Sequence, residues 1–485
     1  MIETTADTVF KVFAANHSRR GLHSLVVLSL LSTALCGVFT PILSDEVFSL
    51  DLAGMNWGPM LAQLRSDVHP PLYYWLLRLW FGVMPATEAG LRAFSGACLI
   101  VATIFIWRFL RNVTDSGVAL AGLALWLANP LVILMAGYGR MYLLLAVWCV
   151  IALDAGWRLC AAPVGRPTQC VVLAATLAGL LTHNWFVFYL CGLAAMMAWQ
   201  HGRAALRLIA PLSGGALLYA LVWGGTALRQ AAGRQGQLAW LQPPTWQAPF
   251  DAAIAHLWLP LLAAPLILIV VAVGKPQRSA APLFHRAALL GAAVTIAIPL
   301  AVSLWKPVFN PRFTIVVAPL IALGLAGLVQ RGGTAAAALL LVMGAGWSIW
   351  DASHPSSCNS RAAAAVLSQQ AHPEDTVIYT RLSRKPVEWY WHDSASRRFS
   401  FPAEIDVHPG YEGVRSEASL RMEARRIANE TVGRVFVVAD PSRLPSRILL
   451  EEIRARWHEQ SPDCLACEQA GKHYFSELIL FDVKR

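Results

Sequence analysis

The stretch TQCVVLAATLAGLLTHNWFVFYLCGLAAMMAWQ, residues 168–200, decides how this chain is arranged. It contains no Lys, Arg, Asp or Glu. A helix that crosses a bilayer core of about 30 Å needs about 20 apolar residues, so the stretch is too long for one span and short for two. Thr182, His183 and Asn184 interrupt it at its centre, where a single lipid-facing helix would not place polar groups. We therefore expect two spans that meet at a polar turn.

Other long uncharged runs lie on both sides of this stretch. They cover residues 22–43, 93–110, 117–137, 141–160, 204–226, 252–273, 287–305, 313–330 and 334–350. Together with the divided stretch they predict about 11 transmembrane helices. The first run ends in Pro41 and lacks the small-residue pattern of a cleavage site, so we expect it to stay as an anchor.

Composition indicates a membrane protein with a soluble tail. Hydrophobic residues make up 56% of the chain, charged residues make up 14%, and the mean hydropathy is +0.50. A soluble domain carries roughly 25% charged residues, so the composition excludes a wholly soluble protein. Residues 1–350 hold 21 of the 39 Lys and Arg residues but only 10 of the 29 acidic ones. The positive excess belongs to the membrane part and predicts no nucleic-acid partner.

The basic residues also set the orientation of the chain. Cytoplasmic loops of membrane proteins carry an excess of Lys and Arg. With eleven spans and a cytoplasmic N-terminus, each cytoplasmic loop contains basic residues, such as Arg203 and Arg207. The outer side then receives the loop 44–92, the loop 226–251 and the tail from Asp351. We expect the protein in a bacterial inner membrane, with its C-terminal domain outside the cytoplasm.

The outer loop 44–92 contains an aromatic-rich segment, HPPLYYWLLRLWFGVMP, at residues 69–85. Its apolar part is short and includes Arg78, which argues against a further span. Aromatic-rich segments of this kind lie in the membrane interface. We therefore predict a juxtamembrane helix.

The tail has the alternating pattern of a small α/β domain. Its β-branched and aromatic runs predict strands at 376–380, 434–440 and 474–483, and its periodic segments predict helices at 361–371, 415–429 and 444–458. No Gly-rich phosphate loop follows a strand, so we expect no nucleotide site. The predicted fold is thus an α-helical polytopic membrane domain, residues 1–350, followed by a small α/β soluble domain, residues 351–485.

Cys464 and Cys467 form a CxxC pair in the tail. A local disulfide competes there with half of a zinc site, and no second CxxC or nearby His pair completes four ligands. The spacing favours the disulfide, and both alternatives stay open.

Several polar residues fall at the outer ends of the predicted spans. Asp45 and Glu46 follow the first span, where a carboxylate can be a general base or a metal ligand, or simply be solvated. The loop acids Asp51 and Asp67 are expected to be solvated. His69 stands before two prolines, which fix an extended backbone and so the position of the imidazole.

Four further residues share this outer side. They are Arg140, Tyr142, His183 and Arg312. Arg suits bidentate phosphate binding, although an arginine at a span end can also reach for lipid head groups. A lone His is more often structural than functional. The convergence of all these residues on one face is a stronger signal than any one of them.

The order of several segments resembles a known family. SDE at 44–46, HPPLYYWLLRLW at 69–80, LRAFSGACL at 91–99, GRMYLLL at 139–145, LLTHNWFVFYL at 180–190 and PRFTIVVAPLIAL at 311–323 carry the likeness. Over residues 20 to about 350 the chain resembles the bacterial protein-mannosyltransferase-like and aminoarabinose-transferase-like glycosyltransferases of GT-C type. The resemblance implies a membrane enzyme that transfers a sugar from a polyprenyl phosphate to a lipid, glycan or protein acceptor.

The resemblance also implies roles for individual residues. Asp45 and Glu46 match the catalytic acidic pair of the first loop. His69, Arg140, Tyr142 and Arg312 match positions that meet the donor phosphate, and His183 matches a position where, with Asp45, a divalent metal cation is expected. Relatives often carry a carboxylate two residues before the arginine, whereas this chain has Tyr138.

Two other classes of function compete with the enzyme. A transporter or flippase of lipid-linked sugars also needs basic residues in the membrane, but it usually places polar or broken helices near the midplane. A noncatalytic scaffold that presents the tail would tolerate the loss of Asp45. The charged candidates lie at outer span ends, which favours the enzyme.

Overall fold

The computed structural model of the protein describes residues 21–485 apart from 163–164, 233–240, 242, 274–281, 354–359, 393–395, 407–414, 460–476 and 484–485. The chain forms two compact units. The helical unit comprises the chain up to Val38, Leu64–Arg229 and Pro243–Ala352, and the sheet unit comprises Phe39–Gln63, Gln230–Gln242 and Ser353–Arg485. Cys464 and Cys467 lie outside the described residues.

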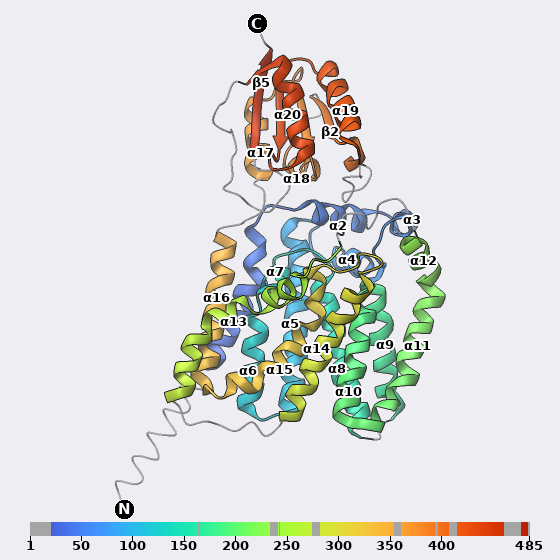
Figure 1. Ribbon diagram of the computed structural model, residues 1–485, viewed down its shortest axis with the longest axis vertical. Helices are drawn as coiled ribbons and strands as arrows, with labels where there is room; N and C mark the ends of the chain where they lie inside the picture. The colour runs from blue at the N-terminus through green and yellow to red at the C-terminus, as the bar shows by residue number, and fades with distance from the viewer. Residues whose placement is uncertain are drawn as a thin grey trace, which may run out of the picture. The chain divides into compact units, whose positions relative to one another are not determined.

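The helical unit is built from long apolar helices that run alongside one another in Figure 1. After the helix Gly21–Leu35 these are α5 (Glu88–Val113), α6 (Ser116–Leu127), α7 (Pro130–Ala136), α8 (Tyr142–Ala161), α9 (Arg166–Thr182), α10 (Phe186–His201), α11 (Ile209–Tyr219), α12 (Gly225–Ala232), α13 (Ala248–Val273), α14 (Pro282–Val302), α15 (Ala318–Gln330) and α16 (Gly333–Ser353). Short helical turns join or extend them: η1 (Cys36–Phe39), η2 (Gly202–Leu208), the π-helical η3 (Ala220–Gly224) and η4 (Pro311–Val317).

By length and composition, 7 described helices could cross a membrane, or up to 8 if the bent pair of α6 and α7 is one span. Two further predicted spans correspond to helices that are too short for this count, Gly21–Leu35 and α9. The run Phe186–Ala232 counts once, although its 47 residues exceed twice the length that crosses a bilayer. It turns at Gly202, whose φ of 56° favours glycine. Figure 1 shows the chain reversing between α10 and α11. Each of the eleven predicted spans therefore matches a helix or a bent run of helices.

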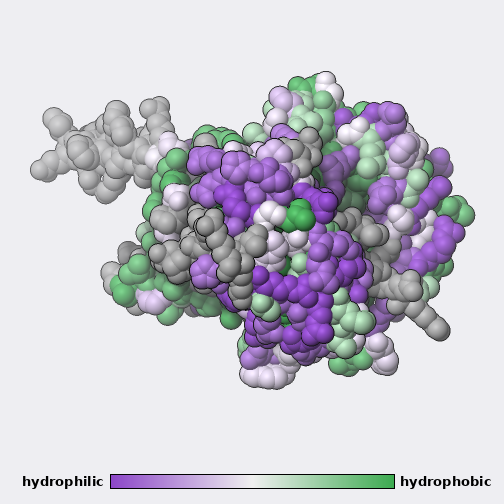
Figure 2. Space-filling view, turned by 90° about the horizontal axis from the view of Figure 1, so that it is seen from above, coloured by the Kyte–Doolittle hydropathy of each residue, from purple (hydrophilic) through white to green (hydrophobic). Residues whose placement is uncertain are grey.

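The outer surface of the helical unit suits a lipid environment. Large apolar side chains are exposed along α11, η3 and α13, among them Leu217, Leu221, Leu262 and Leu268. Figure 2 looks onto a different face of the molecule, which is largely hydrophilic and has apolar residues at its edges. Isolated exposed leucines are ordinary in soluble proteins, but rows of them on long helices are typical of membrane proteins.

The sheet unit contains a mixed sheet of five strands in the order β2-β1-β3-β5-β4. The strands are β1 (Thr376–Thr380), β2 (Arg397–Phe401), β3 (Val435–Ala439), β4 (Trp457–Glu459) and β5 (Glu477–Val483). Strand β1 pairs in parallel with β2 and β3, whereas β5 is antiparallel to β3 and β4. This arrangement forms the centre of a three-layered domain.

Helices cover both faces of this sheet. Along β1, Val377 and Tyr379 face α17 (Ser360–Gln370) and α18 (Arg384–Tyr390), while Ile378 faces α19 (Glu417–Glu430) and α20 (Leu444–Arg456). The alternation follows from the two-residue period of a strand. Because both faces are covered, the central strands are apolar throughout, and every residue of β1 and β3 is buried.

The predicted α/β tail is confirmed, with additions. Three strands and three helices lie where their sequence patterns predict them. The sequence did not predict α18, which is short and contains Pro386, or β2, an edge strand with the polar residues Arg397 and Arg398. It also extended α20 through Trp457, which begins β4 instead.

The outer loop is more helical than expected. It contains α2 (Ser44–Gly54), α3 (Trp57–Ser66) and α4 (Leu72–Trp80). Helix α4 is the predicted juxtamembrane helix and belongs to the helical unit. Helix α2 belongs to the sheet unit, together with the tail. A short 3-10 turn, η5 (Ala403–Asp406), completes the described elements of the sheet unit.

Candidate functional site

His69 is the middle member of a chain of three polar side chains. Its Nδ1 lies 2.7 Å from Oδ2 of Asp67, and its Nε2 lies 3.1 Å from Nη2 of Arg140. A guanidinium only donates hydrogen bonds, so Nε2 of His69 accepts and Nδ1 donates its proton to Asp67. Asp67 and Arg140 are buried, whereas His69 is partly exposed. We call these three residues the Asp67–His69–Arg140 cluster.

The segment around His69 is held on two sides. Helix α4 begins directly after Pro71, and its residues Tyr73 and Tyr74 are fully buried. Oη of Tyr74 accepts a hydrogen bond of 3.3 Å from Nη1 of Arg140. The neighbouring Val68 accepts one of 3.4 Å through its carbonyl from the side chain of Asn184, in the turn between α9 and α10. These contacts fix the imidazole in front of the guanidinium.

Arg140 follows a tight turn between α7 and α8. The hydroxyl of Ser95 donates to the carbonyl of Tyr138 at 3.0 Å, and the hydroxyl of Tyr73 donates to the carbonyl of Gly139 at 2.8 Å. The amide of Arg140 also donates to the carbonyl of Tyr138, at 2.8 Å. Two consecutive carbonyls are thus held by side chains from α5 and α4. The backbone that carries Arg140 is organised before any ligand binds.

Aromatic rings lie beside this cluster. The ring of His183 lies 6.4 Å from that of His69, 6.1 Å from that of Tyr142 and 4.9 Å from that of Phe313. Tyr142 also stacks with Tyr138 at 6.0 Å. All these distances fall in the range of favourable ring contacts. They give the polar cluster an apolar flank, which excludes water and strengthens electrostatic interactions.

His183 occupies the turn between α9 and α10. Its Nδ1 accepts a hydrogen bond of 3.1 Å from the amide of Trp185, which leaves Nε2 to carry the proton of the neutral ring. Burial lowers the pKa of His183 from 6.5 to about 3, and nearby positive charges, including those of Arg140 and Arg312, act in the same direction. His183 is therefore neutral at physiological pH.

Arg312 lies in η4, the turn that precedes α15. Asn310 caps this turn by accepting the amide hydrogen of Arg312 at 3.1 Å. The next residue, Phe313, makes the ring contacts described above. Arg312 brings a second positive charge near His183.

A network of buried polar side chains holds η4 in place. His256, on α13, lies 2.9 Å through Nε2 from the hydroxyl of Thr314 and 3.0 Å through Nδ1 from Nδ2 of Asn129. Thr314 donates its own hydrogen to the carbonyl of Pro311, so it accepts from His256. Asn129 also caps α7, at the bend after α6. The network links three elements and leaves the imidazole satisfied and neutral, as a buried polar chain requires.

Asp45 and Glu46 lie in the first turn of α2, in the sheet unit. Glu46 is fully buried, and its Oε2 accepts the amide hydrogen of Leu43 at 2.9 Å. It therefore caps its own helix. Asp45 is partly exposed. Both carboxylates lie at a helix N-terminus, which stabilises negative charge.

The structure thus gathers five predicted site residues in the helical unit: His69, Arg140, Tyr142, His183 and Arg312. The acidic pair Asp45 and Glu46 belongs to the sheet unit.

The expectation that Asp67 is solvated is wrong, because its side chain is 2% exposed and paired with His69. The spacing Asp67-Val68-His69 was a usable signal, since a carboxylate two residues from an imidazole can orient it. Tyr73, Ser95 and Phe313 gave no signal in the sequence. Their roles depend on contacts between distant segments of the chain.

The sequence analysis predicted a divalent cation at His183 and Asp45. In the part of the chain that the structure describes, no group of three His, Cys, Asp or Glu side chains could hold a metal ion. His183 and Asp45 lie in different units. The described residues thus offer no three-ligand group for a divalent cation, and the proposed reaction is derived without one.

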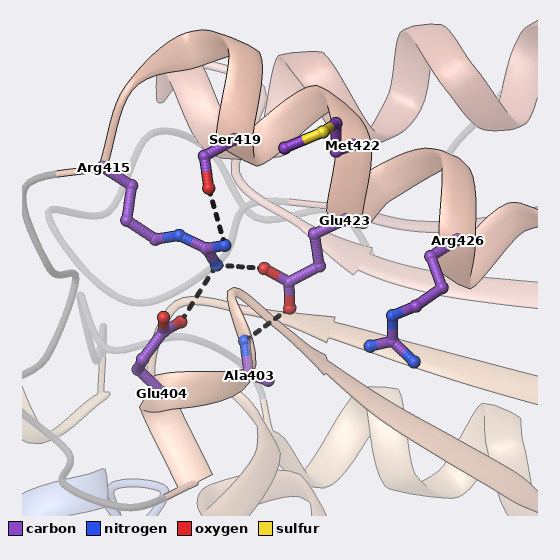
Figure 3. Close-up of a pocket in the computed structure, with 7 residues that line it drawn as sticks. All are labelled: Ala403, Glu404, Arg415, Ser419, Met422, Glu423 and Arg426. Carbon is purple, nitrogen blue, oxygen red and sulfur yellow. Dashed lines mark hydrogen bonds and ion pairs between the residues drawn. The ribbon is translucent and has the colours of Figure 1, made fainter.

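A pocket of about 410 Å³ lies on the sheet unit, between η5 and α19 (Figure 3). Arg415 donates to Glu404 at 3.2 Å, to Ser419 at 2.8 Å and to Glu423. Glu423 in turn accepts the amide hydrogen of Ala403 at 3.0 Å. The charged groups at the centre of Figure 3 thus pair with one another, which is typical of a structural network that holds η5 on α19.

Comparison with known proteins identifies the fold. No protein-family model and no curated protein matches the sequence. The structure of ArnT from Cupriavidus metallidurans bound to undecaprenyl phosphate is similar, with a TM-score of 0.54 and 11% identity over 94% of this chain and 97% of that chain. The same protein in the apo state gives a TM-score of 0.56 and 10% identity over 96% and 98%.

A third structure, the archaeal oligosaccharyltransferase AglB from Archaeoglobus fulgidus with an inhibitory peptide and a dolichol-phosphate, matches 92% of this chain and 73% of that chain at 13% identity and a TM-score of 0.43. The chain has the GT-C fold of the aminoarabinose transferase ArnT. The resemblance noted in the sequence is confirmed at the level of the fold.

Proposed function

We propose that the protein is a membrane glycosyltransferase that takes a sugar from a polyprenyl-phosphate donor. The observation that carries the proposal is the Asp67–His69–Arg140 cluster, in which a buried guanidinium meets a partly exposed imidazole. Such an oriented guanidinium suits a phosphate group, which accepts charge-assisted hydrogen bonds from arginine. ArnT, which has the same fold, binds undecaprenyl phosphate in one of its structures.

The cluster can stabilise the charge that develops on the leaving phosphate. When the bond between the anomeric carbon and the phosphate oxygen breaks, negative charge accumulates on that oxygen. Arg140 and Arg312 supply fixed positive charge, and His69, held by Asp67, keeps the guanidinium of Arg140 in position through Nε2. Donors that are already in place cost little reorganisation during the reaction, which is why such groups contribute strongly to catalysis. The hydroxyl of Tyr142 completes the proposed phosphate-binding group.

Asp45 is the proposed general base for the acceptor hydroxyl. It takes the proton of that hydroxyl as the hydroxyl oxygen attacks the anomeric carbon, and phosphate leaves from the opposite face. Glu46 has a structural role instead, because its carboxylate accepts a hydrogen bond from the amide of Leu43. We assign it to the local structure of α2 rather than to the reaction.

We place the reaction on the outer face of a bacterial inner membrane, with the tail outside the cytoplasm. The acceptor is a lipid, a glycan or a protein, and the membrane lipids surround the helical unit. A transporter or flippase of lipid-linked sugars is the alternative, and it moves the donor without breaking the bond to phosphate. Release of polyprenyl phosphate therefore separates the two functions.

The test uses the full-length protein in closed proteoliposomes with a synthetic polyprenyl-phosphate sugar. Release of polyprenyl phosphate in the presence of an acceptor extract is measured by mass spectrometry. Asp45→Asn should lower the rate by about 10² to 10⁴, the usual contribution of a general base. Glu46→Gln should retain most of the activity. Unchanged turnover in Asp45→Asn would remove that residue from the reaction, and movement of intact donor across the bilayer without release would favour the flippase.

A further inference from the structure

Helix α2, which carries Asp45, is attached to the tail at the helix's beginning. The amide of Ile42 donates a 2.9 Å hydrogen bond to Oη of Tyr390, the last residue of α18. Ile42 is fully buried, and Leu43 packs against the apolar cluster between α17, α18 and the sheet. The residues just before the carboxylate therefore form part of the core of the tail.

A second attachment lies further along α2. Nζ of Lys385 lies 2.7 Å from Oδ2 of Asp51. Lys385 stands near the start of α18, whereas Tyr390 ends it. The two contacts therefore set α2 and α18 antiparallel, with Asp45 between the attachment points. Helices α2 and α18 pack against each other within the sheet unit.

The first attachment is itself supported on both sides. The guanidinium of Arg361, on α17, lies over the ring of Tyr390 at 5.3 Å from its centre. At the start of α2, Glu46 holds the amide of Leu43, so the first turn cannot rotate independently of the segment packed on the tail. The backbone that leads into Asp45 is thus held by a residue far away in the sequence, since 348 positions separate Ile42 from Tyr390.

We propose that the tail is a positioning element for the transfer reaction, and that Lys385 and Tyr390 are positioning residues for the Asp45 carboxylate. The inference rests on the proposed function, because it concerns the aspartate assigned there as general base. Displacing a reacting group by about 1 Å can lower a rate by about a hundredfold even when the altered residue is far from the chemistry. The tail then affects turnover through α2 without touching a substrate.

The central experiment reverses the charges of the second attachment. Lys385→Asp places two carboxylates side by side and should lower kcat about ten- to hundredfold, with little change in KM for the donor. Asp51→Lys should do the same. The double variant restores an oppositely charged pair and should recover most of the lost kcat. Because the pair is partly exposed, it contributes little to overall stability, so these variants should fold.

Two further variants test whether the loss of kcat is specific to the contacts between α2 and α18. Tyr390→Phe removes the bond to Ile42 and should lower kcat in the same direction while preserving the ring contact with Arg361. Reversal of the pair Arg425–Glu452, which joins α19 to α20 on the far side of the sheet, is the matched control and should leave kcat unchanged.

Hydrogen exchange of residues 42–52 gives a readout that does not depend on transfer. Lys385→Asp should accelerate exchange there, and the double variant should restore protection. Wild-type kcat in the single variants, or a double variant as slow as the singles, would overturn the proposal. If the wild-type protein transfers no sugar, the proposed function fails, and unchanged exchange in Lys385→Asp would then overturn the attachment as well.

Discussion

At the scale of single residues, the site depends on the geometry of Arg140 more than on its charge. Its two terminal nitrogens reach different partners, His69 and Tyr74, because the guanidinium is planar and forked. A lysine at this position would supply a point charge that cannot reach both. An arginine that merely contacts lipid head groups would tolerate that exchange.

Arg140→Lys should therefore lower kcat/KM for a polyprenyl-phosphate sugar about ten- to hundredfold, the usual worth of a hydrogen bond to a charged group. His69→Ala should have a similar effect. Arg158→Lys is the control, since Arg158 pairs with Asp154 on the same helix and takes no part in the cluster. The measurement is steady-state transfer by the purified variants, and full activity in both Arg140→Lys and His69→Ala would remove these residues from the site.

His183 makes the stability of the protein depend on pH. The folded protein holds this ring neutral down to a pH of about 3, because burial lowers its pKa, whereas the unfolded chain takes up the proton near pH 6.5. Between these values the unfolded state binds more protons, so stability falls as the pH drops below 6.5. Above pH 6.5 the ring is neutral in both states and contributes no pH dependence.

His183→Gln should abolish this contribution. The amide oxygen of Gln can still accept the hydrogen bond from Trp185, and Gln does not titrate. Between pH 7.5 and pH 4.5 the variant should lose less Tm than the wild-type protein, by an amount that corresponds to at most about 3 kcal/mol. His23→Gln, at an exposed position, serves as the control. Parallel pH curves for wild type and His183→Gln would contradict the assignment.

The sequence predicts residues of this kind only when their neighbours in the chain reveal them. His69 is recognisable from the two prolines after it, and Arg140 from its place at a span end. Asp67 is equally close in sequence, yet it was expected in solvent, because burial of a loop acid depends on what packs over it. Phe313 and Ser95 face the site through contacts between segments far apart in the chain, which periodicity does not report.

At the scale of elements, the turn between α7 and α8 is the part that side chains hold in place. The hydroxyls of Tyr73 and Ser95 donate hydrogen bonds to the carbonyls of Gly139 and Tyr138, respectively. These two carbonyls lie outside the regular hydrogen-bond pattern of a helix. The arrangement gives the short helix α4 a role beside the long helices. It supplies Tyr73 to the turn and Tyr74 to the guanidinium.

The double variant Tyr73→Phe, Ser95→Ala should lower kcat about tenfold, because Arg140 is then less precisely placed. Its stability should fall by about 2 kcal/mol, the sum expected for two such hydrogen bonds. Tyr189→Phe is the matched control, since Tyr189 is a buried tyrosine that donates to the carbonyl of Cys149 at 2.7 Å. It should lose stability without a specific loss of kcat. Equal losses of kcat in both proteins would assign Tyr73 and Ser95 to stability alone.

Hydropathy predicts the helices well and their breaks poorly. It divides the stretch 168–200 correctly, because polar residues mark the turn. It reads 117–137 as one span, whereas α6 and α7 are bent by 56°. The bend lies at Asn129 and Pro130, where the asparagine caps a new helix and bonds to His256 on α13. A hydropathy average over a window of apolar residues does not detect a hydrogen bond between two helices.

At the scale of the whole molecule, the remaining question is which side of the membrane each part faces. The distribution of Arg and Lys requires an odd number of spans before Asp351 if the N-terminus is cytoplasmic. Each predicted span has a counterpart among the described helices, including the short helix Gly21–Leu35 and the turn at Gly202. A chain with eleven spans carries its tail to the side opposite its N-terminus.

Fusion of alkaline phosphatase after Trp350 should therefore give an active enzyme in bacteria, because this enzyme folds only outside the cytoplasm. Fusion after Arg203, which lies in η2 between α10 and α11, should be inactive. Both fusions must be present at equal levels in the membrane, which an immunoblot checks. An inactive fusion after Trp350 together with an active one after Arg203 would reverse the orientation. It would also move His69 and Arg140 to the cytoplasmic face, where a polyprenyl-phosphate donor would have to be used before it crosses the membrane.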